Sequence, residues 1–180
     1  MTERSFAVVP ATDDDWSAIW PFFREIVADG ESYAFPLDLT EETGRPWWME
    51  QSPGRTVVAR AGDGRVLGSA KWGPNRPGRG SHVATASFMV DPAARGLGVG
   101  RALATHVVAA AATAGYAGMQ FNAVVETNTA AVALWTALGF RVVGTVPRAF
   151  DSRRHGLVGL HVMYRPLAAD DPAPPTANGS

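Results

Sequence analysis

Three glycines alternate with other residues between two arginines in the segment Arg95-Gly96-Leu97-Gly98-Val99-Gly100-Arg101. The segment follows a predicted strand and opens a predicted helix, a junction where backbone N–H groups and the positive end of the helix dipole converge on an anion. Glycines let the backbone approach phosphate oxygens without a Cβ in the way, and the two arginines add positive charge. The spacing predicts a phosphate-binding loop. The alternative is a tight turn with a purely structural role.

The residues after the glycines narrow the class of phosphate ligand. Gly100 is followed by Arg101 and Ala102, so the Lys-Ser/Thr pair of a P-loop is absent. A dinucleotide-binding fingerprint beginning at Gly96 would need a glycine at position 101 and an acidic residue about 20 positions later at a strand end. The sequence therefore argues against nucleotide hydrolysis and against a Rossmann cofactor.

Other side chains outside this loop can carry proton transfer or hydrogen bonding. His82 begins a predicted strand, and imidazole titrates near neutral pH. Glu31 lies in a predicted irregular segment, and Asn122 interrupts an apolar strand, where a buried amide needs a partner. Each of the three also has a purely structural interpretation. His82 could pack in the fold, Glu31 could be solvated, and Asn122 could bond within the protein. The polar loop 151–155 is either a solvated turn or a border of the functional site.

The composition describes a single domain of 180 residues with 46% hydrophobic and 18% charged positions. The absence of cysteine excludes disulfides, thiolate catalysis, iron–sulfur clusters and cysteine zinc sites, and no metal is expected. A net charge of −1 argues against nucleic acid or an anionic membrane as partner. No apolar run approaches the ~20 residues that span a bilayer, and the first residues lack the apolar core of a signal peptide. The sequence predicts a cytoplasmic protein.

The predicted elements that position these residues alternate between strands and helices. A strand over 6–9 precedes a helix from about residue 13, kinked or restarted at Pro21, then an irregular segment over 30–36 and a short helix over 40–49 that Gly44 and Pro46 interrupt. A hairpin over 56–60 and 65–70 turns at Gly62-Asp63-Gly64. Further strands are predicted over 82–90, 118–125, 140–146 and 157–164, with helices ending near residue 113 and spanning 127–138. Residues 1–167 form the predicted domain, and 168–180 a disordered C-terminal tail.

Two segments of the chain resemble the GNAT superfamily of acetyl-CoA-dependent N-acetyltransferases. Residues 90–103 resemble its pyrophosphate-binding motif, with the pattern Arg/Gln-x-x-Gly-x-Gly/Ala at Arg95, Gly98 and Gly100. Residues 126–140 resemble its Asn-x-x-Ala-x-x-x-Tyr-x-x-x-Gly-Phe stretch. The resemblance covers residues 4 to 166. It implies an α/β (α+β) GNAT fold, in which about four helices flank a mixed, mostly antiparallel sheet of about seven strands.

The resemblance also implies where acetyl-CoA binds. The pantetheine arm would lie in the splay between the strand ending Phe88-Met89-Val90 and the strand containing Phe121-Asn122, with Asn128 holding the arm. The pyrophosphate would rest on Arg95, Gly96, Leu97, Gly98, Val99, Gly100 and Arg101. Trp135 stands where many members have a tyrosine that protonates the leaving thiolate. An indole N–H cannot act as an acid near neutral pH, so Trp135 is expected to pack on the cofactor.

A closer resemblance concerns the acceptor. Glu25-Ile26, Gly30, Tyr33, Pro74-Asn75, Ser81-His82 and Phe121-Asn122 are similar to the family's proline-analogue acetyltransferases of yeast, which act on azetidine-2-carboxylate. In those enzymes two asparagines surround the imino acid; the second matches Asn122, and the first falls at Thr85, which can still hydrogen-bond but has a shorter reach. Tyr33 and Phe35 either wall the acceptor pocket or pack in the core. The candidate catalytic residues are therefore Asn122, His82, Thr85 and Glu31.

The implied reaction is direct attack of a small-molecule amine on the thioester, with backbone amides near Phe88 and Met89 as donors to the developing oxyanion. The acceptor would be an amino acid, an imino acid or an amine-bearing antimicrobial, which suggests a role in detoxification or resistance. The alternatives are a protein or peptide N-acetyltransferase and a non-catalytic acetyl-CoA-binding module. The resemblance also implies a homodimer that pairs through the C-terminal part of the sheet.

Overall fold

One seven-stranded sheet organises the computed structural model, which describes residues 6–167. The strands lie in the order β1-β2-β3-β4-β5-β7-β6, and every neighbouring pair is antiparallel except β4 and β5. Their bounds are β1 Phe6–Pro10, β2 Arg55–Ala61, β3 Val66–Pro74, β4 Val83–Val90, β5 Gly118–Val125, β6 Arg141–Ser152 and β7 Gly156–Pro166. The helices are α1 Trp16–Asp29, α2 Glu41–Trp48, α3 Val99–Thr113 and α4 Thr129–Ala137. This architecture confirms the predicted fold class.

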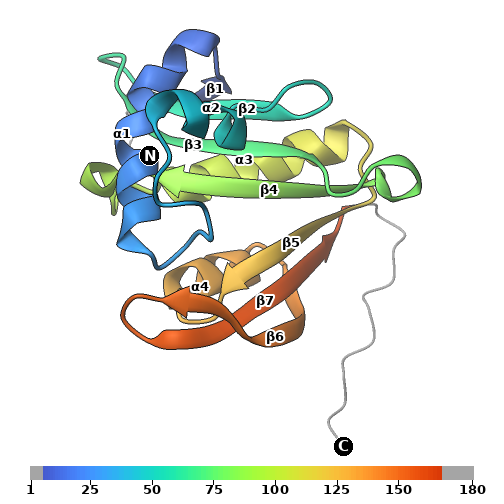
Figure 1. Cartoon of the computed structure of the whole chain (residues 1–180). Helices are drawn as coiled ribbons and strands as arrows, with labels where there is room; N and C mark the ends of the chain where they lie inside the picture. The colour runs from blue at the N-terminus through green and yellow to red at the C-terminus, as the bar shows by residue number, and fades with distance from the viewer. Residues whose placement is uncertain (1–5, 168–180) are drawn as a thin grey trace, which may run out of the picture.

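Helices cover both faces of the sheet and define two cores (Figure 1). The alternation of side chains along β2 divides its residues between them, because Val58 packs with α1 and α2 whereas Val57 and Ala59 pack on the α3 side. Trp48 of α2 is fully buried, and its indole N–H donates to Ser69 Oγ at 2.9 Å. No helix within residues 6–167 is long and apolar enough to cross a membrane.

The parallel strands β4 and β5 pair over a very short length. The ladder joins Val83 to Gly118 and Ala84 to Met119 and then stops. Beyond that point the two strands diverge (Figure 1), so the sheet is open between them. The β5–β7 register also shifts between Phe121 and Val124, where β5 carries an extra residue. Such a bulge bends its strand, and bulges are frequent beside active sites.

Several predicted boundaries differ from the structure. Helix α1 continues through Pro21, and α2 runs unbroken through Gly44 and Pro46, so the predicted interruption is wrong. Gly44 lies against the Trp20 ring, where a Cβ would come within 2.8 Å, so its small size serves helix packing. Strand β6 extends six residues beyond its predicted end because a register shift after residue 146 lets pairing with β7 resume. The predicted tail lies outside the described residues.

The entry to α1 depends on a buried carboxylate. Burial by itself would raise the pKa of Asp15, but hydrogen bonds from the Thr12 N–H, the Arg60 guanidinium and the Thr12 hydroxyl outweigh it and lower the pKa. A lowered folded-state pKa gives stability that is present above the unfolded value of about 3.9 and is lost as the pH falls through the folded value. We expect Asp15→Asn to lower the free energy of unfolding by about 1–2 kcal/mol at pH 7, since the bonds to a charged group are weakened.

The measurement is urea unfolding of wild type and variant between pH 7 and pH 3. The difference between them should shrink below about pH 4. Asp14→Asn, at an exposed neighbour, is the control and should leave stability unchanged. A difference that persists unchanged to pH 3 would contradict the assignment.

Candidate active site

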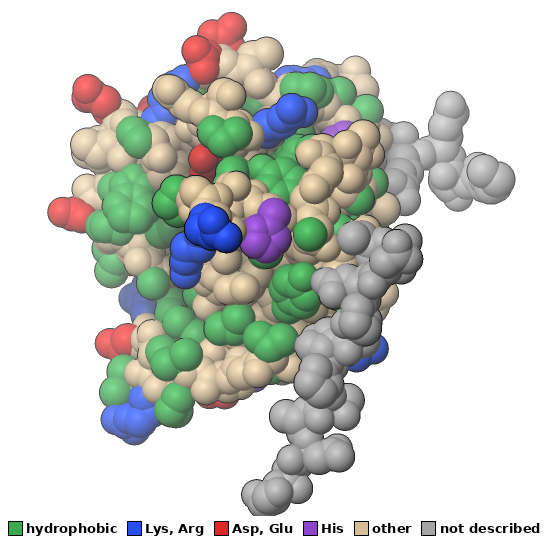
Figure 2. Space-filling model, turned by 90° about the vertical axis from the view of Figure 1, so that its right-hand side faces the viewer, with side chains coloured by type: hydrophobic (Ala, Val, Ile, Leu, Met, Phe, Trp, Pro, Cys, Tyr) green, Lys and Arg blue, Asp and Glu red, His purple; other side chains and the backbone are tan. Residues whose placement is uncertain are grey.

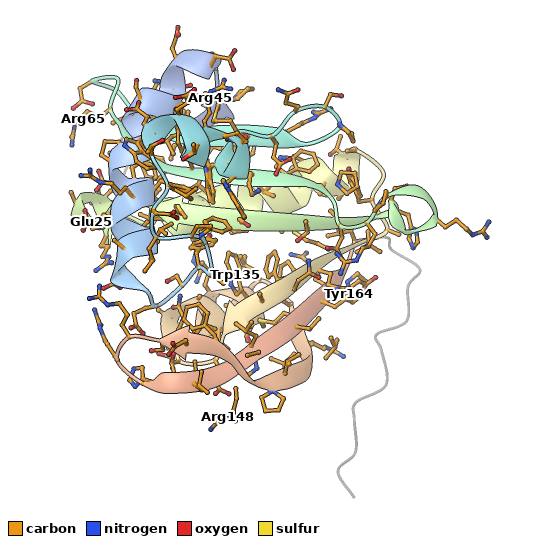
Figure 3. The ribbon with its side chains drawn as sticks, viewed as in Figure 1. Glu25, Arg45, Arg65, Trp135, Arg148 and Tyr164 are labelled. Carbon is orange, nitrogen blue, oxygen red and sulfur yellow. The ribbon has the colours of Figure 1, made fainter. Side chains whose placement is uncertain are left out.

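A cleft of about 850 Å³ occupies the space where β4 and β5 diverge. Residues 85–90 of β4 and 121–125 of β5 form its two walls, and α1 with the segment after it closes one side. Figure 3 shows Trp135 between the two strands and Glu25 on α1. The cleft therefore lies at the predicted position between the two central strands.

Aromatic rings line the α4 side of the cleft. The Trp135 ring lies 4.8 Å from both Phe88 and Phe121, measured between ring centroids, and Phe121 stacks on Phe140 at 4.3 Å. Only 8% of Trp135 is exposed, so its main contacts are with these rings. Asn128 also lines the cleft, and its side-chain oxygen caps α4 by accepting the Ala131 N–H at 3.2 Å.

The glycine segment forms the start of α3, at one end of the cleft. Gly98 is the N-terminal cap of the helix with φ of 77°, and Gly96 has φ of 82°, a region that residues with a Cβ rarely adopt. No atom lies within 4 Å of the position that a Cβ would take at either residue. The first N–H groups of α3 have no acceptor within the helix. With Arg95 on the cleft wall, these features fit an anionic diphosphate.

Tyr33 occupies part of the open edge of β4. Its hydroxyl accepts the Phe88 N–H at 3.0 Å and donates to the Phe88 carbonyl at 2.7 Å. Its ring stacks on Phe35 at 5.0 Å, and both residues line the cleft. Burial raises the pKa of the Tyr33 phenol, so it stays protonated near neutral pH. Tyr33 therefore fixes the backbone of β4 at Phe88, and its phenol does not serve as an acid or base near neutral pH.

The backbone N–H groups of β4 point alternately toward β3 and toward the cleft. The Asp91 N–H bonds to β3, and alternate residues of a strand point their N–H groups to opposite sides. The amide of Met89 therefore faces β3, whereas those of Ala86, Phe88 and Val90 face the gap. Tyr33 already bonds the Phe88 amide, so the oxyanion donors expected near Phe88 and Met89 are partnered in this structure. The amides of Ala86 and Val90 lie along the same open edge.

Uncharged polar groups line the other side of the cleft. Asn122 is exposed, and its amide donates to Asn75 Oδ1 at 2.6 Å and accepts from Gln120 at 2.8 Å. Asn122 is therefore bonded and solvent-facing, in contrast to the buried amide considered from the sequence. Thr85 and Ser87 also line the cleft, from the opposing strand β4. Together these groups can hydrogen-bond a neutral polar acceptor.

Glu31 does not line the cleft and instead joins two segments far apart in the chain. Its carboxylate accepts the Ser152 hydroxyl at 2.7 Å and the Arg154 N–H at 3.0 Å. The Ser152 hydrogen bond, followed by the Arg154 N–H and charge, lowers the pKa of Glu31 below its usual value. We call this contact between residues 28–31 and 152–154 the β6–β7 bridge. Both carboxylate oxygens of Glu31 therefore already accept a hydrogen bond.

His82 lies at the paired end of β4 and β5, away from the cleft. It lines a second, smaller pocket of about 280 Å³ with Arg55, Trp72 and Tyr116. This end of the molecule is the face in Figure 2, where basic, histidine and hydrophobic side chains occupy the centre and most acidic ones lie toward its left and upper margins. Of the four candidate catalytic residues, the structure brings only Thr85 and Asn122 into the cleft.

The model of the Acetyltransferase (GNAT) family matches residues 18–140. The chain belongs to the GNAT family of acetyltransferases. N-acetyltransferase aca1 of Schizosaccharomyces pombe is 33% identical over 161 residues, which are 81% of this chain and 77% of that protein. The family resemblance predicted from the two motifs is confirmed, and the chain is an acetyltransferase.

Solved structures of GNAT proteins share the fold. A GCN5-related N-acetyltransferase from Kribbella flavida superposes with a TM-score of 0.88 at 59% identity, covering 90% of this chain and 98% of that one. A phosphinothricin acetyltransferase from Sinorhizobium meliloti, solved in complex with AcCoA, gives 0.82 at 24% identity, covering 96% and 94%. At that identity the second similarity concerns the fold alone.

Besides Arg95, four charged residues line the cleft. Glu25 and Asp29 lie one helical turn apart on α1, and Arg153 and Arg154 come from the β6–β7 turn. The helical spacing of Glu25 and Asp29 was a usable signal. The position of the arginines agrees with the second alternative given for loop 151–155, a border of the site, although the contact that places them spans more than 120 residues of chain. Within residues 6–167, no three His, Asp or Glu side chains gather as a metal site would need.

Proposed function

We propose that the chain transfers the acetyl group of acetyl-CoA to the amine of a small amino or imino acid by direct attack. The observation that carries the proposal is one cleft with a glycine-rich helix start and Arg95 at one end and uncharged hydrogen-bonding side chains along its wall. The Sinorhizobium meliloti enzyme was solved in complex with AcCoA, and yncA from Salmonella typhimurium with its cofactor acetyl-CoA. Family membership and these relatives support the same donor here.

The chain offers a distinct group for each part of acetyl-CoA. Residues 95–101 would hold the pyrophosphate through backbone N–H groups and the Arg95 and Arg101 guanidinium groups. The open edges of β4 and β5 offer alternating N–H and C=O groups to the pantetheine amides, with Asn128 at the end of β5. Trp135, packed against Phe88 and Phe121, gives the arm an apolar wall.

Acetyl-CoA supplies a thioester whose carbonyl carbon is attacked by the amine nitrogen while the carbon–sulfur bond breaks. Asn122 and Thr85 would orient the amine by hydrogen bonding, and the open amide of Val90 or Ala86 would donate to the carbonyl oxygen. The amine proton would leave through water toward Glu25, which has no ion pair within residues 6–167. The leaving thiolate has a pKa of about 8.5, so it departs without a dedicated acid.

The β6–β7 bridge supports a small acceptor over a polypeptide. It connects α1 to the β6–β7 turn through five hydrogen bonds and crosses one side of the cleft. A peptide N-terminus would need an extended groove beyond this contact. The implied homodimer stays a prediction; Val142, Val143 and Val146 are about half exposed on the edge strand β6.

The experiment that tests the function is thiol release from acetyl-CoA with a panel of acceptors. The panel holds azetidine-2-carboxylate, proline, primary amino acids, polyamines, aminoglycosides and a peptide with a free N-terminus. We expect turnover with imino or amino acids. Turnover with the peptide alone would move the function to protein acetylation. Binding of acetyl-CoA without any turnover would indicate a non-catalytic module.

A further inference from the structure

Five charged side chains line the cleft, and one ion pair joins two of them. The residues are Glu25, Asp29, Arg95, Arg153 and Arg154. Arg154 Nη2 contacts Asp29 Oδ1 at 3.0 Å, so these two charges neutralise each other. Arg95 belongs to the phosphate-binding loop. Arg153 is thus a cation on the acceptor side with no carboxylate partner within residues 6–167.

The position of Arg153 is set before any acceptor binds. Its Nη1 donates to the Ala28 carbonyl at 2.8 Å, and its backbone N–H donates to the Gly30 carbonyl at 3.4 Å. Its side-chain stem lies over Gly30, where a Cβ would come within 2.6 Å of Arg153 Cγ and Cδ. Gly30 therefore leaves the space that the stem needs. The bonds use one of the guanidinium nitrogens and leave Nε and Nη2 without a partner in the described chain.

We propose that Arg153 binds the carboxylate of the acceptor and thereby selects amino and imino acids over amines that lack a carboxylate. This inference rests on the proposed function and names the substrate class. A guanidinium presents a planar fork of N–H donors that matches a carboxylate, and a fork held in place loses little freedom on binding. The carboxylate occupies the donors that the protein leaves open.

The surroundings of Arg153 complement the other end of such an acceptor. Thr85 and Asn122 line the same cleft and carry no charge, so they accept or donate hydrogen bonds to an amine in its neutral, reactive form. Glu25 stands one helical turn before Asp29 and supplies the only unpaired negative charge among the described cleft residues. One unpaired cation and one unpaired anion fit a small molecule with a carboxylate and an amine.

The test compares two acceptors of equal size that differ in charge. We expect wild type to have a kcat/KM for proline at least about 10-fold above that for prolinamide, and Arg153→Gln to lower the value for proline by about 10- to 100-fold, mainly through KM. The value for prolinamide should stay within a factor of about two. Arg153→Lys should fall between, because lysine keeps the charge and loses the fork. Azetidine-2-carboxylate and azetidine form a second matched pair.

Arg148→Gln is the control, since Arg148 lies on the same hairpin outside the cleft and its loss removes the same charge. Acetyl-CoA affinity of each variant, measured by calorimetry, reports whether the cleft is intact. If Arg153→Gln lowers both acceptors equally, or neither, Arg153 does not read the carboxylate, although acetyl transfer to small amines stands. If wild type turns over only the peptide of the panel, the proposed acceptor class fails together with this inference.

Discussion

Gly98→Ala is expected to weaken acetyl-CoA binding by about 10- to 100-fold, because it places a Cβ where the phosphate oxygens must approach the start of α3. Gly98 has φ of 77° and caps the helix, and the space in front of it is open. Alanine in that conformation also costs about 1–2 kcal/mol of stability. Calorimetric titration with acetyl-CoA measures the first effect and thermal unfolding the second.

Gly115→Ala separates the two effects. Gly115 has φ of 87° with no neighbour within 4 Å of its Cβ position, and it follows the opposite end of the same helix. It should show a similar loss of stability with unchanged affinity for acetyl-CoA. Equal losses of affinity in both variants would mean that backbone strain, and not the loop, accounts for the weaker binding.

Asn122→Ala is expected to lower kcat/KM for the acceptor by about 10- to 100-fold while the KM for acetyl-CoA stays within a factor of about two. Asn122 lies in the bulged part of β5 and is the exposed amide of the cleft wall. The substitution removes the amide that we propose binds the acceptor and leaves residues 95–101 unchanged. Steady-state kinetics with the best acceptor of the panel checks the result.

Gln120→Ala is the matched control for this prediction. Gln120 donates to Asn122 Oδ1 at 2.8 Å but does not line the cleft. It should change kcat/KM by less than about fivefold, since a single neutral hydrogen bond contributes only about 1 kcal/mol. If Gln120→Ala and Asn122→Ala lose the same activity, Asn122 acts as part of the hydrogen-bonded chain and does not contact the acceptor.

The order of the elements and the glycine turn that opens α3 could be predicted because their signals are local. Glycine spacing over seven residues, the Asp-Gly turn between β2 and β3 and the apolar periodicity of α3 each depend on neighbours in sequence. Boundaries were less accurate where tertiary packing decided them. Helix α2 tolerates Gly44 because Trp20, two dozen residues earlier, packs against it.

The family and the glycine turn at the start of α3 could be identified without coordinates, since both depend on residue types at fixed spacing. Which polar residues meet in the cleft depends on how distant elements pack. His82 stays outside because β4 and β5 still pair at Val83, and Glu31 stays outside because Ser152 and Arg154 bind it. Arg153 reaches the cleft through Ala28, 125 residues away in the chain. Contacts over such separations depend on how the elements pack, and no local pattern encodes them.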